Sequence, residues 1–142
     1  ERVDTAHVMN YKGAMFSGIP NMACAFGYTN ASWTLKADLT AGFVCRLLRH
    51  LDAVGATHAT PRPDPAVREE PLLDFSSGYV QRALAQLPKQ GSKRPWRLFQ
   101  NYVLDLMMLR YGRIDDPSLE LGRPAPRPRA TPRPVDASPS PT

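Results

Sequence analysis

The chain has 142 residues, a net charge of +5, 42% hydrophobic and 22% charged residues, the profile of an ordinary globular domain. This composition excludes a wholly disordered chain, a collagen-like repeat and a disulfide-rich scaffold, and no apolar run reaches the roughly 18 residues of a membrane span. Two features are unusual, because proline occurs 15 times and the first residue is Glu1 rather than methionine.

Two short apolar segments stand near the beginning of the chain. Lys12–Phe16 and Met22–Gly27 flank the sequence Gly18-Ile19-Pro20-Asn21, which is typical of a turn. Residues Met22–Phe26 are apolar at every position, as in a strand that is buried on both faces. We therefore expect two short strands, the second of them buried.

A long amphipathic helix is predicted over about residues 30–53. Thr29 or Asn30 would cap its start, and Gly55 would end it. Its apolar residues recur every four positions, and its charged residues are expected on the solvent side. The apolar row is Ala31, Leu35, Leu39, Phe43, Leu47 and Leu51, Val44 and Leu48 broaden it into a face, and the charged residues are Lys36, Arg46, Arg49 and Asp52.

Proline divides the sequence that follows the long helix. Residues 56–73 are expected to be extended, with Thr57–Thr60 as an edge strand. Ser76 or Ser77 would then cap a short helix that ends at Pro88.

A basic loop and a third helix come next. The loop covers residues 90–95, and Pro95 suits a first helical turn. The third helix is predicted over about 96–111, and Gly112 would close it. The fold class expected for the chain is therefore mainly α-helical with a few short strands.

Residues 122–142 have a composition of their own. They hold seven of the prolines, and four arginines against one aspartate give them +3 of the net charge. With almost no apolar side chains, this segment is predicted to be a disordered tail with polyproline character, which leaves 1–121 as the folded unit. A basic tail attracts nucleic acid or anionic lipid weakly, but no recognition motif accompanies it. No specific nucleic-acid partner is therefore expected, and peripheral membrane contact stays open.

The residues show no catalytic motif. The three histidines lack the spacing of metal ligands, and there is no Gly-x-Gly-x-x-Gly fingerprint, P-loop or nucleophile elbow. Cys24 and Cys45 lie in apolar surroundings, which favours free, buried thiols and the reducing cytosol. A basic group of Lys89, Lys93, Arg94 and Arg97 suits either a phosphate or a solvated loop.

The start of the long helix is the one place where polar groups gather. Thr29, Asn30 and Ser32 stand where unpaired amides carry partial positive charge and attract an anionic or polarised oxygen. The same residues would also suit a helix that merely caps itself, so geometry alone leaves both interpretations open.

The sequence around this helix start resembles a known family. The run Gly27-Tyr28-Thr29-Asn30-Ala31-Ser32-Trp33-Thr34-Leu35-Lys36-Ala37-Asp38-Leu39 is similar to the C-terminal part of flavin-containing monooxygenases of the Baeyer–Villiger type. Within that family it resembles the actinobacterial subgroup that activates thioamide prodrugs such as ethionamide. Phe75–Tyr79, Leu87–Ser92 and Pro95–Tyr102 also look like this subgroup, and the resemblance covers about residues 8–126.

The resemblance implies an α/β parent protein with two dinucleotide-binding domains, of which residues 1–121 would be the C-terminal part of the FAD-binding monooxygenase domain. It implies FAD and NADPH as cofactors and O2 and a small organic molecule as substrates. One oxygen atom would be inserted into a ketone, or a sulfur or nitrogen centre would be oxidised, through a flavin C4a-peroxide. The glycine fingerprints of both dinucleotides would lie in the missing N-terminal portion, so the chain alone would be inactive.

The resemblance also implies where the flavin lies. The strand Met22–Phe26 would lead into a helix start that faces the flavin ring, with Thr29 and Asn30 as contacts and Tyr28 and Ser32 as further candidates. No catalytic residue and no metal ligand is expected in this chain, because the cofactor carries the chemistry. An alternative function is a non-enzymatic helical interaction module, or a relic, that acts through its basic proline-rich tail.

Overall fold

The computed structural model describes residues 3–29, 31–72 and 86–123 of the chain. They form a few helices and a few short strands around one core. In chain order the elements are the 3₁₀ turn η1 (Thr5–His7), β1 (Asn10–Tyr11), β2 (Met15–Phe16), α1 (Trp33–Val54), β3 (His58–Pro61), β4 (Glu69–Pro71), β5 (Lys89–Gly91), α3 (Tyr102–Leu106), the π-helical segment η2 (Met107–Tyr111) and β6 (Leu119–Gly122).

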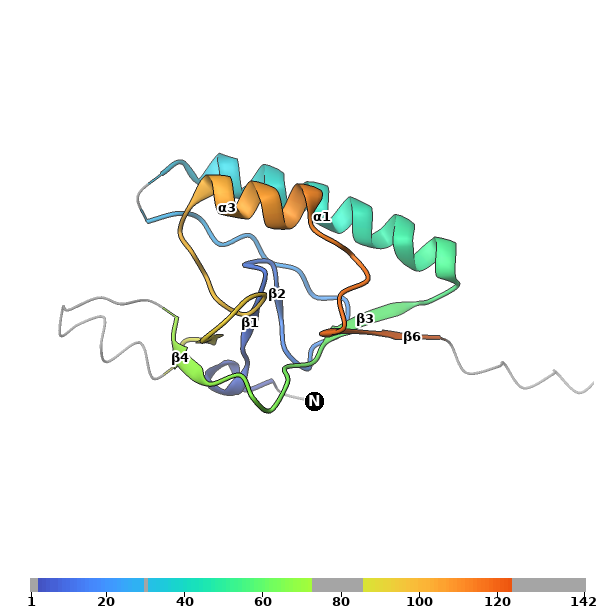
Figure 1. The fold of residues 1–142 in the computed structure, drawn as a ribbon, viewed down its shortest axis with the longest axis horizontal. Coiled ribbons are helices and arrows are strands. Elements are labelled where there is room, and N and C mark those ends of the chain that lie inside the picture. The colour runs from blue at the N-terminus through green and yellow to red at the C-terminus, as the bar shows by residue number, and fades with distance from the viewer. Residues whose placement is uncertain (1–2, 30, 73–85, 124–142) are drawn as a thin grey trace, which may run out of the picture.

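The described strands form three separate antiparallel pairs, β1 with β2, β3 with β6 and β4 with β5. In Figure 1, α1 and α3 lie side by side along one edge of the molecule, and the strand pairs lie on the other side. The core fills the space between them and includes Tyr11, Phe43, Trp96 and Leu109, each at most 1% exposed.

The structure confirms the long helix and corrects its ends and its buried face. Ser32 rather than Thr29 or Asn30 is the cap residue, and Gly55 ends α1 in the left-handed conformation at φ +66°. A strict four-residue repeat turns by about 40° per step around a helix of 3.6 residues per turn. The row therefore leaves the core at the start of α1, where Leu35 is exposed and Lys36 is buried instead. Leu48, expected to broaden the apolar face, is also exposed.

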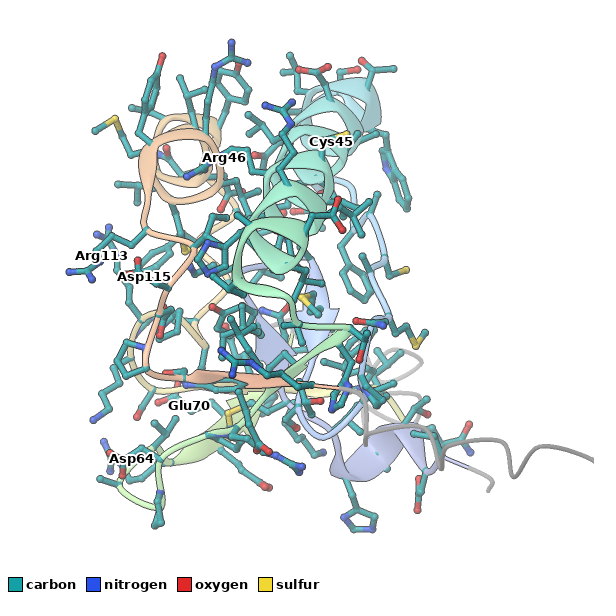
Figure 2. The ribbon with its side chains drawn as sticks, turned by 90° about the vertical axis from the view of Figure 1, so that its right-hand side faces the viewer. Cys45, Arg46, Asp64, Glu70, Arg113 and Asp115 are labelled. Carbon is teal, nitrogen blue, oxygen red and sulfur yellow. The ribbon has the colours of Figure 1, made fainter. Side chains whose placement is uncertain are left out.

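The side chain of Arg46 ties α1 to the segment beside it. Its guanidinium donates hydrogen bonds to the carbonyls of Leu109 (2.6 Å) and Gly112 (2.7 Å), at the end of η2. Figure 2 shows Arg46 reaching from α1 toward the neighbouring helical segment, whereas Arg113 and Asp115 lie at the periphery. These carbonyls have no intrahelical donor at a helix end, so Arg46 satisfies them. The prediction that Arg46 faces solvent is therefore wrong.

The prediction of a buried strand at Met22–Phe26 is also wrong. The segment makes one β-bridge, between Met15 and Ala23, and Met22 is 45% exposed. Within the described residues no further strand pairs with it, so its apolar side chains have no sheet to cover them on both faces. The turn that precedes it is confirmed by positive φ angles at Gly18 and Asn21. The other predicted segment is shorter than expected, because Lys12 and Gly13 form the turn between β1 and β2.

The third helix begins later than the pattern predicts. Trp96 lies in the core, in the irregular segment before α3. The amide of Leu98, in the same segment, donates a hydrogen bond to the side chain of Gln90 (2.9 Å). Asn101 then caps α3 by accepting a hydrogen bond from the amide of Leu104 (3.1 Å). Residues 96–101 are therefore an irregular segment rather than the first turns of the predicted helix. Gly112 follows the helical segment as expected, and an added Cβ there would collide with the carbonyl of Met108.

Other expectations have mixed outcomes. The edge strand after the long helix is confirmed as β3, and the first two residues of the expected basic loop, Gln90 and Gly91, belong to β5 instead. Cys24 and Cys45 are free, but Cys45 is exposed and Cys24 half-buried, so their predicted burial is wrong. Gly122 belongs to β6 rather than to a tail.

Two predictions lie outside the described residues, namely most of the short helix after Ser76 and the rest of the tail, 124–142. Among the helices that the structure describes, none has the length and apolarity to cross a membrane.

Two adjacent leucines of α1 test the assigned core face. Replacing Leu47 (5% exposed) by alanine should lower the free energy of unfolding by about 2–5 kcal/mol, because it leaves a cavity. Replacing Leu48 (55% exposed) by alanine should change it by less than about 0.5 kcal/mol. Urea unfolding of both variants measures the difference, and equal losses would contradict the assignment.

Candidate functional site

The residues predicted to bind a ligand lie where the chain enters α1. Tyr28 is buried, with 4% of its surface exposed, whereas Thr29 and Ser32 are exposed. Asn30 lies outside the described residues. The hydroxyl of Ser32 shares a hydrogen bond with that of Thr34 (2.7 Å) and does not cap the helix.

Tyr28 belongs to a buried polar cluster with Lys36 and Asp105. The Tyr28 hydroxyl donates to Oδ2 of Asp105 (2.7 Å), and the Lys36 ammonium donates to the same oxygen (2.8 Å). Lys36 and Asp105 are each 1% exposed, and the Lys36 Nζ also lies 5.8 Å from the centre of the Tyr28 ring. We call these three residues the Tyr28–Lys36–Asp105 cluster; it joins the entry to α1, its second turn and α3.

Burial sets the ionisation of this cluster. It lowers the pKa of Lys36, against the opposing effect of the Asp105 carboxylate. It raises the pKa of Tyr28, and the hydrogen bond and negative charge of Asp105 raise it further. The tyrosine hydroxyl therefore stays protonated at neutral pH and keeps donating to Asp105.

Sequence reasoning did not find Lys36 or Asp105. Lys36 lies three and four positions before Leu39 and Thr40, both buried, so helical spacing places it on the core face. That signal was available, but a lysine is normally counted as a solvent residue. Asp105 had no signal of its own, since its partners stand 69 and 77 positions earlier.

Thr29 is held by Gln100, a second contact from the same distant segment. The side-chain oxygen of Gln100 accepts hydrogen bonds from the amide (2.9 Å) and the hydroxyl (3.3 Å) of Thr29. Gln100 itself has a φ of +51°, a conformation that residues other than glycine rarely adopt.

A cavity of about 500 Å³ opens beside these residues. It is lined by Phe26, Gly27, Tyr28, Thr29, Trp33, Leu72, Leu98 and Gln100. Its wall is mostly aromatic and aliphatic, and polar groups come from Thr29 and Gln100. Gly27 is required here, because an added Cβ would overlap the ring of Trp33. Such a hollow suits the edge of a planar ring with polar substituents.

A larger cavity, of about 900 Å³, lies on another part of the described structure. Lys93 and Arg94 of the predicted basic group line it, but Lys89 and Arg97 do not. Two of its other charged residues are already paired with each other, since Lys12 lies 3.4 Å from Asp116. The basic group is therefore not gathered around one position.

Metal binding has no support within residues 3–29, 31–72 and 86–123. No group of three histidine, cysteine, aspartate or glutamate side chains there could hold a metal ion.

Comparison with known proteins identifies relatives over most of the chain. It is 56% identical over 128 residues to the FAD-containing monooxygenase EthA of Mycobacterium tuberculosis, and 53% identical over 120 residues to that of Mycolicibacterium smegmatis. It is 42% identical over 116 residues to a protein of Acinetobacter baylyi named "Probable FAD-binding monooxygenase AlmA".

These matches cover 89%, 84% and 80% of this chain but only 26%, 24% and 23% of the respective relatives. The chain therefore spans about a quarter of the length of these relatives. No family model matches it, and no solved structure does.

The raised pKa of Tyr28 predicts a loss of stability in alkali. The Tyr28 hydroxyl ionises near pH 10 in the unfolded chain and at higher pH in the folded one. Its contribution to the free energy of unfolding is therefore complete below pH 10 and is lost as the pH rises above 10. Replacing Tyr28 by phenylalanine should reduce the slope of unfolding free energy above pH 10, by up to about 1.4 kcal/mol per pH unit.

The matched control is Tyr111→Phe, since Tyr111 is 67% exposed. Urea unfolding at several pH values compares the two variants with the unaltered protein. The assignment fails if Tyr28→Phe and Tyr111→Phe change the slope equally.

Proposed function

We propose that the chain is part of an FAD-containing monooxygenase and that it forms the part of that enzyme that contacts the flavin ring of FAD. The observation that carries this proposal is the identity of 56% over 128 residues to a monooxygenase whose name states FAD. The cavity beside Thr29, at the start of a long helix, supports the position within the chain.

The residues around this cavity fit one edge of a flavin in their chemistry. Phe26 and Trp33 offer apolar and aromatic surface to a ring, and Thr29 offers a hydroxyl. The first amides of α1 carry the positive end of the helix dipole, which favours the negative charge of a reduced flavin. Thr29 and Asn30 are the proposed direct contacts.

Tyr28 and Ser32 have a different place in the proposal. The hydroxyl of Tyr28 donates to Asp105, so we assign Tyr28 to holding the loop rather than to a polar contact with the flavin. Ser32 lies at the first turn of α1, where its backbone contributes to the helix start.

We propose that the whole protein uses NADPH and O2 to oxidise a small organic substrate, by oxygen insertion into a ketone or oxidation at sulfur or nitrogen. Bound FAD supplies the electron transfer and the oxygen activation. The residues of this chain bind and orient the ring and shield one edge of it from water. This chain has no Gly-x-Gly-x-x-Gly run, so we place the glycine-rich sites for both dinucleotides in the part of the whole protein that lies outside this chain.

The free thiols of Cys24 and Cys45 favour a cytoplasmic location, because a reducing compartment keeps thiols unpaired. The interaction-module alternative has no observation in its favour, since the similarity to monooxygenases extends over 89% of the chain.

Substitution of the proposed contacts in the full-length monooxygenase tests the site. Thr29→Ala and Asn30→Ala should each weaken FAD binding about tenfold, because each removes polar contacts worth about 1 kcal/mol or somewhat more. The measurement is the dissociation constant of FAD, together with the visible absorption spectrum of the bound flavin.

Thr57→Ala is the matched control, because Thr57 is exposed and its hydroxyl makes only two long contacts, with Nδ1 of His58 (3.4 Å) and with the carbonyl of Gly122 (3.5 Å). Unaltered protein that purifies without FAD, or variants that bind FAD as tightly as the control, would reject the proposed site.

Anaerobic NADPH should bleach the flavin, and failure to do so would reject the proposed reductant.

A further inference from the structure

The loop that enters α1 is fixed by a segment more than 70 positions away in the sequence. Gln100 holds the backbone and the hydroxyl of Thr29, and Asp105 holds the hydroxyl of Tyr28. Both contacts come from the short stretch that leads into α3 and from α3 itself. The position of the loop therefore depends on this stretch as well as on α1.

Gln100 makes its contact from an unfavourable backbone conformation. A φ of +51° places its Cβ close to its own backbone, which is unfavourable for a residue other than glycine. Thr29 is exposed, so hydrogen bonds to it add little to the stability of the fold. The strained residue thus fixes a loop rather than the core.

Asp105 makes its contacts from complete burial. Its Oδ2 accepts hydrogen bonds from both Tyr28 and Lys36, whereas its Oδ1 has no hydrogen-bond partner among the described residues. A carboxylate shared in this way cannot move without separating both donors. Because Lys36 is in the second turn of α1, Asp105 fixes the helix and the loop to one another.

We propose that Gln100 and Asp105 are positioning residues for the flavin-contacting loop, acting through Thr29 and through Tyr28. This inference rests on the proposed function, because it assumes that the loop faces the flavin. Asp105 does not line the cavity beside Thr29, whereas Gln100 does, and the role proposed for Gln100 is to hold Thr29 through its side-chain oxygen. Gln100 orients the amide and hydroxyl of Thr29, and Asp105 fixes the distance between Tyr28 and the start of α1.

The test uses the full-length monooxygenase with Gln100→Ala, Gln100→Glu and Tyr28→Phe. Gln100→Ala removes the acceptor and should raise the dissociation constant of FAD about three- to tenfold and shift the flavin absorption spectrum. Gln100→Glu keeps an acceptor oxygen and should restore binding to within about twofold. Tyr28→Phe keeps the ring and should weaken binding in the same direction.

Gln86→Ala is the matched control, because Gln86 is exposed and the described contact of this residue is made by its backbone carbonyl. The thermal unfolding midpoint of each variant is measured alongside FAD binding. A positioning role predicts that Gln100→Ala changes the flavin spectrum while its midpoint matches that of Gln86→Ala.

The outcomes separate this inference from the proposed function. If Thr29→Ala weakens FAD binding and Gln100→Ala and Tyr28→Phe do not, positioning by Gln100 and Asp105 is rejected and the flavin site stands. If none of the three weakens it, both are rejected. Equal loss in Gln100→Ala and Gln100→Glu also rejects positioning through the acceptor oxygen.

Discussion

The buried ion pair between Lys36 and Asp105 constrains how the two helices meet. Each charge is 1% exposed, and removing an ion from water costs several kcal/mol unless a partner compensates it. The two side chains must therefore meet at hydrogen-bonding distance wherever α1 and α3 pack. Because Tyr28 donates to the same carboxylate oxygen, the requirement extends to the loop before α1. The apolar core alone would permit small shifts between the helices that this pair forbids.

The sequence predicted the elements whose causes are local. α1 follows from apolar residues at helical spacing and from Gly55, which adopts the left-handed conformation that ends helices. β3 follows from a short segment between Gly55 and the run of prolines that begins at Pro61. The resemblance to flavin monooxygenases likewise depended on short contiguous runs of residues, and the relatives confirm it.

Elements that depend on distant partners were not predictable in the same way. The start of α3 is set by Asn101 and by the amide of Leu98, which donates to Gln90 in β5. The Met22–Phe26 segment has the composition of a buried strand, but strand formation also needs a partner strand, and beyond the single bridge at Ala23 no described strand pairs with this segment. The site shows the same limit. Thr29 could be selected from local pattern, whereas Gln100 and Asp105 act across more than 70 positions.

The pairing of Lys36 also decides the electrostatics of the loop. An unpaired lysine in the second turn would dominate the local field and would attract any anion nearby. Asp105 neutralises it at 2.8 Å, so the pair adds almost no net charge at the helix start. The partial charges of the first amides of α1 then remain the main positive field that the loop experiences. Such a field suits a ring whose charge changes between oxidation states. The partial charges stabilise the reduced, negatively charged form of the ring, whereas a full lysine charge would attract electron-rich groups on the ring in both oxidation states.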